Sequence, residues 1–167
     1  DDGWYTVRAY DPTGVYASTA YTHTPWLEWH TLFEVKNGAS LVIDAIQMPA
    51  GGAVSGVVQR PSGSPITNAT VTVWKNGEEM TRIAEDWHVD AAGRFRAARL
   101  WPGRYLVCAE TNSLPFFARN CHGVTPGFNW YSNAQPVTVT AGAETAGVVI
   151  TLGPAPVNPV FLPQIER

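Results

Sequence analysis

The feature that most constrains this chain is a succession of short runs of β-branched, aromatic and alternating apolar residues, each bounded by turn-forming residues. Glycine, proline, aspartate and asparagine mark reversals at residues 11–14, 37–38, 61–63 and 76–77. The runs between such turns predict strands, and together they indicate an all-β fold. The predicted strands are residues 4–10, 15–22, 31–36, 40–46, 52–60, 69–75, 93–100, 103–110, 116–121, 135–141 and 146–152.

One segment departs from this pattern. In residues 78–89, Met80, Ile83, Ala84 and Trp87 recur at helical spacing, which is compatible with a short helix. So short a helix has little stability of its own, and the segment is equally compatible with an irregular crossover or an edge strand. The sequence leaves these alternatives open.

The composition excludes helical and unfolded classes. Charged residues make up 15% of the chain, and its 167 residues include 15 glycines and 13 prolines, against a usual charged content of roughly 25%. A coiled coil or helical bundle is therefore excluded. The chain is 45% hydrophobic with seven tryptophans, which is enough to close a core.

Charge and hydropathy also limit the partners. The net charge is −3, and Lys36 and Lys75 are the only lysines, so there is no basic stripe for nucleic acid. No run approaches the roughly 18 apolar residues of a membrane span. The sequence opens on Asp1-Asp2 with no basic and apolar leader, as expected of a mature, soluble form.

The chain contains an internal repeat. Residues 3–21 align without gaps on residues 103–121, and residues 32–48 align on residues 136–152. About fifty strand-like residues precede the second copy, whereas two residues precede the first. We therefore expect a partial β-sandwich module, the latter half of a fold, over residues 1–48. A complete module follows over residues 49–153, and a proline-rich extended tail over residues 154–167.

Three stretches of the second copy carry a family resemblance. They are "GAVSGVVQRPSGSPITNATVTVW" (52–74), "VDAAGRFRAARLWPGRYLV" (89–107) and "YSNAQPVTVTAGAETAGVVITL" (131–152). They resemble the carboxypeptidase-regulatory-like modules of bacterial secreted proteins. The resemblance implies a transthyretin-like (Ig-like) Greek-key β-sandwich and an extracellular, cell-surface location. In such a sandwich Gly93 and Gly103 lie at tight turns, and the residues expected between the sheets are Phe95, Leu100, Tyr105 and Val107.

The two cysteines, Cys108 and Cys121, are equidistant from a predicted hairpin turn near Leu114-Pro115. If residues 105–110 and 116–121 pair as the arms of that hairpin, the thiols lie opposite one another, near disulfide distance. A disulfide is favoured over two independent buried thiols.

No catalytic pattern is present, and we expect a protein that is not an enzyme and binds no cofactor. The serines lie outside any G-x-S-x-G elbow, and no phosphate-binding glycine loop occurs. The histidines, His23, His30, His88 and His122, lack the close companions of metal sites, although Asp86 and Asp90 flank His88.

Aromatic residues and one sequon are candidate surface features. The loop between the hairpin and the closing strands contains Trp26 and Trp29 in the first copy, and the equivalent loop of the second copy contains Trp130. They are expected to fold over an open sandwich end, to contact a neighbouring subunit, or to stack on sugar rings. Asn68 begins an N-x-T glycosylation acceptor.

The partial module cannot bury both faces of its sheet by itself. The apolar side chains expected to need a cover are those of Tyr5, Val7, Ala9, Phe33, Val35 and Ile43. The complete module is one possible cover, and added strands from another subunit are the other. Alternatively, the partial copy arises by proteolysis from a longer chain.

The tail offers a donor strand, because its prolines keep it extended around an apolar centre, and Val160 and Leu162 share one face. Its apolar residues are Val160, Phe161, Leu162 and Ile165; the alternative is a linker or disordered end. The sequence thus favours an extracellular structural subunit, a homo-oligomer assembling head to tail into a filament or surface array by strand complementation. The alternative is an accessory carbohydrate-binding or adhesion module of a larger secreted protein, with polysaccharide as its partner.

Overall fold

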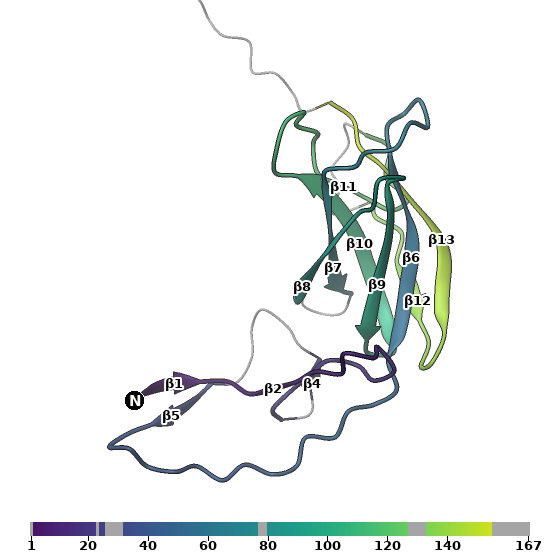
Figure 1. Cartoon of the computed structure of the whole chain (residues 1–167). Helices are drawn as coiled ribbons and strands as arrows, with labels where there is room; N and C mark the ends of the chain where they lie inside the picture. The colour runs from purple at the N-terminus through teal and green to yellow at the C-terminus, as the bar shows by residue number, and fades with distance from the viewer. Residues whose placement is uncertain (1, 23, 26–31, 77–79, 127–132, 155–167) are drawn as a thin grey trace, which may run out of the picture.

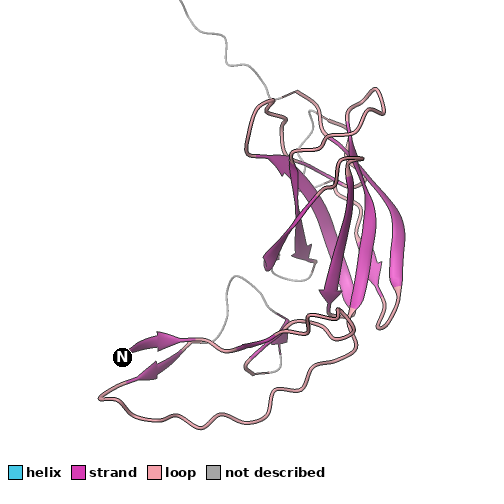
Figure 2. Cartoon of the chain, viewed as in Figure 1, coloured by secondary structure: helices cyan, strands magenta, loops and turns pink. Residues whose placement is uncertain are grey.

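The computed structural model describes residues 2–22, 24–25, 32–76, 80–126 and 133–154. These residues form β-strands and contain no helix (Figure 2), which confirms the all-β prediction. The strands are β1 (Gly3–Tyr5), β2 (Arg8–Ala9), β3 (Thr19–Ala20), β4 (Thr24–Pro25), β5 (Phe33–Val35), β6 (Gly52–Gln59), β7 (Ala69–Lys75), β8 (Thr81–His88), β9 (Arg94–Leu100), β10 (Gly103–Thr111), β11 (Asn120–Cys121), β12 (Val137–Val139) and β13 (Glu144–Thr151).

Strands β6 to β13 form a sandwich of two sheets (Figure 1). One sheet has the order β11-β10-β7-β8, with β12 also pairing with β10, and the other has the order β13-β6-β9. Strand β13 runs parallel to β6, and the other pairs are antiparallel. The side chains expected between the sheets are all buried there: Phe95, Leu100, Tyr105 and Val107. The β-sandwich fold class is thus confirmed.

Alternation along β10 produces two apolar layers. Tyr105 and Val107 face the core between the sheets, while Leu106 and Cys108 belong to a second buried cluster with Cys121. Cys108 is directly opposite Cys121 in the β10–β11 register, and the two are joined by a disulfide. The disulfide therefore holds the short β11 against the sheet edge.

The segment with helical spacing is the edge strand β8, so the helical alternative was wrong. Ile83 and Trp87 point inward, and their separation of four residues fits a strand as well as a helix because both positions lie on the same face of either element. Pairing with β7 from Thr70↔His88 to Lys75↔Thr81, interrupted by a register shift between Thr72 and Trp74, decides between them, since it gives the backbone groups of β8 partners in a sheet.

The internal repeat is preserved as strand pairing. In the first copy Gly3 pairs with Val35 and Tyr5 with Phe33. The equivalent pairs in the second copy are Gly103↔Val139 and Tyr105↔Val137. The turns that follow β5 and β12 also have the same conformation, because Gly38 and Gly142 have φ values of +66° and +67°. The two copies therefore share one local fold over these residues.

The first copy nevertheless forms shorter strands than predicted. The run 4–10 is split into β1 and β2, and no strand occurs in residues 40–46, where one was expected. The equivalent strand of the complete module, β13, pairs only with β6. Among the strands that the structure describes, the first copy has no counterpart of β6, the strand with which β13 pairs in the complete module.

Tyr105 supports one prediction. Its hydroxyl donates a hydrogen bond to the Trp101 carbonyl at 2.8 Å, and burial raises the pKa of Tyr105 to about 12 from 10.0. The folded state thus holds this proton to higher pH than the unfolded state, so the contribution is complete below pH 10 and is lost as pH rises through 12. We expect Tyr105→Phe to lower the free energy of unfolding by about 1–2 kcal/mol at pH 7, measured by urea unfolding. We also expect it to lessen the loss of stability between pH 10 and pH 12; an unchanged alkaline loss would contradict this role.

Candidate interaction site

The N-terminal copy docks on the end of the sandwich where β6 begins (Figure 1). The Ala17 amide donates to the Pro49 carbonyl at 2.9 Å, and the Gly51 amide to the Val15 carbonyl at 2.8 Å. A third backbone bond, from the Ser18 amide to the Arg99 carbonyl, measures 3.0 Å and reaches β9. The two copies are thereby joined by backbone hydrogen bonds as well as by the chain itself.

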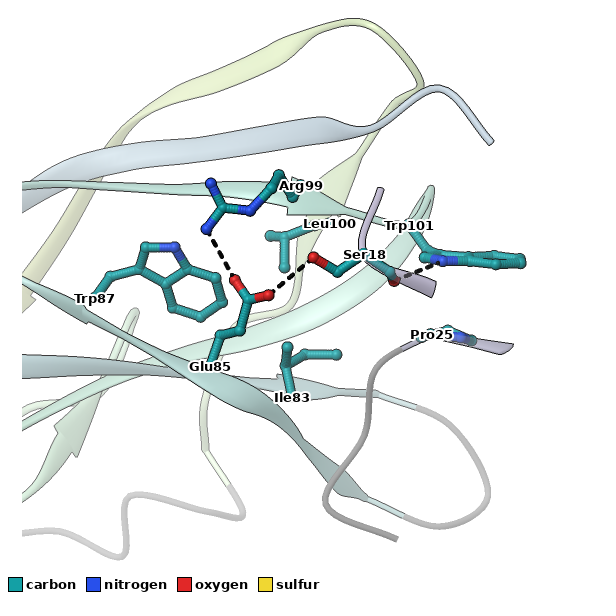
Figure 3. Close-up of a pocket in the computed structure, with 8 residues that line it drawn as sticks. All are labelled: Ser18, Pro25, Ile83, Glu85, Trp87, Arg99, Leu100 and Trp101. Atoms are coloured by element: carbon teal, nitrogen blue, oxygen red, sulfur yellow. Dashed lines mark hydrogen bonds and ion pairs between the residues drawn. The ribbon is translucent and has the colours of Figure 1, made fainter. Parts of the chain in front are cut away.

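Glu85 is the electrostatic centre of this junction (Figure 3). Its carboxylate accepts hydrogen bonds from the Ser18 hydroxyl at 2.8 Å and from Arg99 Nη2 at 3.1 Å, and it pairs with Arg8 Nη2. Its side chain is only 9% exposed. Arg8 and Ser18 belong to the N-terminal copy, whereas Glu85 and Arg99 belong to β8 and β9. A nearly buried charge is thus shared between the two parts of the chain.

Tyr10 and Trp101 also take part in this junction. The Tyr10 ring centroid is 5.0 Å from Cζ of Arg8 and 4.5 Å from Cζ of Arg99, within cation–π range. Trp101 Nε1 donates to the Ser18 carbonyl at 3.1 Å. Arg99 itself has a φ of +63°, a left-handed conformation that side-chain-bearing residues seldom adopt. This backbone strain turns Arg99 within β9 and accompanies its pairing with Glu85.

Sequence reasoning missed the junction. The available signal was Glu85 itself, a carboxylate that lies on the same face as the inward-facing Ile83 and Trp87 once the segment is taken as a strand. A charge at an inward-facing position requires a partner. That the partners come from Arg8 and Ser18 follows only from the docking of the first copy, which no local pattern specifies.

The first copy leaves apolar surface uncovered. Tyr5 is 40% exposed, whereas its counterpart Tyr105 is fully buried. Val42 is 92% exposed. The other residues expected to need a cover are all half-buried: Val7, Ala9, Phe33, Val35 and Ile43. The first copy is therefore not a closed, self-contained sandwich within the described residues.

The sandwich contacts the opposite face of the first copy. The Arg8 side chain reaches Glu85, and side chains alternate along a strand, so those of Val7 and Ala9 are directed to the other face. Strand β1 has β5 as its neighbour, and β2 has β3, among the strands that the structure describes. In the complete module the equivalent strand β10 also pairs with β7 on its second edge. No described strand takes the place of β7 in the first copy.

Several predicted site residues lie outside the described residues. They are the three loop tryptophans and the four apolar tail residues, namely Trp26, Trp29, Trp130, Val160, Phe161, Leu162 and Ile165. Asn68 is described: its Nδ2 donates to the Ser113 carbonyl at 2.9 Å, and the following Ala69 and Thr70 are buried in β7. Its glycosylation remains a prediction.

The described residues contain no group of three His, Cys, Asp or Glu side chains that could hold a metal ion. His88, which lies between two aspartates in the sequence, approaches the Thr70 hydroxyl at 3.4 Å from Nδ1. Nor is there, in the part of the chain that the structure describes, a helix of the length and apolarity needed to cross a membrane.

The fold and the motifs together define a β-sandwich module. The family model of the carboxypeptidase regulatory-like domain matches residues 53–153, and the chain belongs to this family. The match begins after the N-terminal copy and ends with the last strand of the sandwich. No curated protein matches the sequence.

Solved structures give distant likenesses. A proposed carbohydrate-binding protein from Pseudomonas aeruginosa is 15% identical, with 63% of this chain and 90% of that chain covered and a TM-score of 0.37. A minor pilin from Streptococcus agalactiae is 13% identical, with coverage of 85% and 61% and a TM-score of 0.40. A streptococcal ancillary pilin is also 13% identical, with coverage of 90% and 45% and a TM-score of 0.40. This chain thus spans less than two thirds of either pilin.

Proposed function

We propose that the protein is an extracellular, non-catalytic structural subunit that assembles head to tail. In this proposal the C-terminal tail of one copy adds a strand to the N-terminal half-module of the next, and the product is a filament or surface array. The observation that carries the proposal is the unequal repeat: the first copy reproduces the β10–β12 pairing but lacks a counterpart of β7 among the described residues.

The exposed apolar face supplies a reason to associate. Tyr5, Val7 and Ala9 correspond to three core residues of the complete module, all of which are fully buried: Tyr105, Val107 and Ala109. Burying a large apolar side chain yields about 1.5–3 kcal/mol, and backbone hydrogen bonds between an added strand and its acceptor specify register. The tail is a suitable donor because its apolar residues and prolines suit an added edge strand.

The placement of the two ends favours association between copies. The half-module lies at the end of the sandwich where β6 begins, and β13, which runs parallel to β6, ends at the opposite end (Figure 1). Pro154 follows β13 and forms a bridge with Phe117. Strand β6 has eight residues, so the two ends are separated by about 26 Å at 3.3 Å per residue. A donor at one end and an acceptor at the other make a heterologous contact, which propagates rather than closing as a dimer.

The disulfide agrees with an oxidising, extracellular compartment. The Cys108–Cys121 bond is the kind of cross-link that persists in secreted proteins and is rare in the cytosol. An accessory carbohydrate-binding role has no described residue in its favour, because the three tryptophans that suggested it lie outside the described residues.

Sedimentation velocity over a concentration series tests the proposal. The full chain should form a ladder of oligomers, and electron microscopy should show fibres or arrays. A variant ending at Pro154, which keeps every described strand, should remain a monomer. Equal association by both chains would refute a role for the tail, and a monomeric full chain at all concentrations would refute self-assembly.

A further inference from the structure

The internal repeat extends beyond β1 and β10 into the hairpin that follows them. The pairing of β2 with β3 has the same pattern as the pairing of β10 with β11: Arg8↔Ala20 and Ala9↔Thr19 in the first copy, Cys108↔Cys121 and Ala109↔Asn120 in the second. The hairpin of the second copy is therefore one residue longer than that of the first. After the loop, residues 16–20 of the first copy correspond to residues 117–121 of the second.

The same correspondence holds where the chain leaves each copy. In the first copy Tyr16 forms a bridge with Ala50, and the Ala17 amide donates to the Pro49 carbonyl at 2.9 Å. The equivalent contacts of the second copy are the Phe117↔Pro154 bridge and the bond from the Ala118 amide to the Gly153 carbonyl, at 3.1 Å. The sandwich docks beside this exit in the first copy. The second copy repeats the backbone of that docking surface at the opposite end of the sandwich.

The two exits differ in how far they are covered. Ala17 and Ser18 are 0% and 4% exposed, and the Ser18 amide donates to the Arg99 carbonyl of the sandwich at 3.0 Å. Their counterparts in the second copy, Ala118 and Arg119, are only half-buried. The positions that the sandwich covers in the first copy are therefore partly exposed to solvent in the second.

A charged pair accompanies the exit of the second copy. Arg119 Nε donates to Glu110 Oε2 at 2.8 Å, and the two side chains are 34% and 25% exposed. Strand β10 carries Glu110 near its end, and Arg119 directly precedes β11. The Glu110–Arg119 pair thus presents one negative and one positive charge beside the half-buried Ala118.

This pair is complementary to the charges that a sandwich brings to the junction. The position of Arg119 is occupied in the first copy by Ser18, whose hydroxyl donates to Glu85 at 2.8 Å. The position of the acidic partner is occupied by Tyr10, whose ring centroid is 4.5 Å from Cζ of Arg99. The equivalent placement of a sandwich on the second copy brings its carboxylate towards the arginine of the pair and its guanidinium towards the glutamate.

We propose that residues 117–119 and Glu110 form a docking surface for another sandwich of this family, placed as strands β6 to β13 are placed on the first copy. The partner is defined by its chemistry: an acidic side chain at the position of Glu85, a basic one at that of Arg99 and an indole at that of Trp101. Contacts of this kind arrange sandwiches end to end. The surface is separate from the strand addition proposed for the tail and does not depend on it.

A chain with a duplicated sandwich tests this surface. Residues 1–154 are followed by residues 51–167, so that the added sandwich follows the second copy as the natural sandwich follows the first. In the natural junction Trp101 Nε1 donates to the Ser18 carbonyl at 3.1 Å. Trp101 of the added sandwich should bond to the Arg119 carbonyl. Its indole hydrogen should therefore exchange about tenfold or more slowly than in a chain with Glu110→Arg and Arg119→Glu in the first sandwich, measured by NMR with the added sandwich labelled.

The reversed pair is a matched variant, because it keeps an ion pair within the first sandwich and changes only the charges presented. Reversing Glu85 and Arg99 of the added sandwich as well should restore slow exchange. Arg104→Glu, an equal charge change at an exposed position of β10, should leave the exchange rate unchanged. Circular dichroism checks that each variant is folded.

Equal exchange in the duplicated chain and in its reversed variant overturns the proposal, and so does a second reversal that fails to restore slow exchange. Shifts at Ala118 that grow with the concentration of the natural chain also overturn it, because a second copy then covers this surface. The truncation at Pro154 tests the tail alone, so the two proposals fail separately.

Discussion

Replacing Glu85 by alanine should lower the free energy of unfolding by about 3 kcal/mol. The substitution leaves Arg8 and Arg99 without the carboxylate that they share, and their side chains are only 25% and 19% exposed. Removing one partner of a buried pair costs more than the pair contributes, because the remaining charge stays desolvated. The expected value lies at the lower end of the usual range since water still reaches both guanidinium groups.

Urea unfolding measures the loss, and hydrogen exchange locates it. The amides of Ala17 and Ser18 bond across the junction, so they should exchange faster in Glu85→Ala while amides of β10 keep their protection. Glu144 provides a matched control: it pairs with Arg96, and the two side chains are 39% and 57% exposed. Glu144→Ala should cost less than about 1 kcal/mol. Equal losses for the two variants would show that Glu85 does not join the two copies.

Removing the disulfide should lower the free energy of unfolding by an amount comparable to that expected for Glu85→Ala. Cys108 and Cys121 are separated by 13 residues, and closing a loop of about that size is worth roughly 3 kcal/mol in the chain-entropy account. We therefore expect Cys108→Ala with Cys121→Ala to lower the free energy of unfolding by about that amount. This loss of stability should include a weakening of the hydrogen bonds of Asn120 in β11, whose Nδ2 donates to the carbonyls of Val124 and Thr151.

Reductant supplies the control for this prediction. Urea unfolding of the unmodified protein should become as easy as that of the double variant when a phosphine is added, and the double variant should not respond. If the unmodified protein is insensitive to reductant and as stable as the variant, the bond does not stabilise the fold.

The sandwich was predictable because its signals are local. Residues 69–75 and 103–110 alternate or are β-branched between turns, and they form β7 and β10 with nearly the predicted bounds. The opposition of Cys108 and Cys121 followed from their equal distance to the turn. The same alternation places the side chains of Tyr105 and Val107 in the core.

The remainder depended on tertiary context. The segment that forms β8 is compatible with a helix by spacing alone, and only its pairing with β7 makes it a strand. Residues 40–46 have strand propensity but form no strand in the structure. The Glu85 junction brings together residues from positions 8 to 99, and no local periodicity specifies such a contact.

The central claim, that the tail of one copy adds a strand to the first copy of the next, can be tested by NMR with a peptide. A synthetic peptide of residues 154–167 is titrated into the isotopically labelled variant that ends at Pro154, with a scrambled peptide as the control. The account predicts saturable one-to-one binding, with the largest amide shifts in residues 3–9 and small shifts in β10. Absence of binding, or shifts confined to the sandwich, would contradict it.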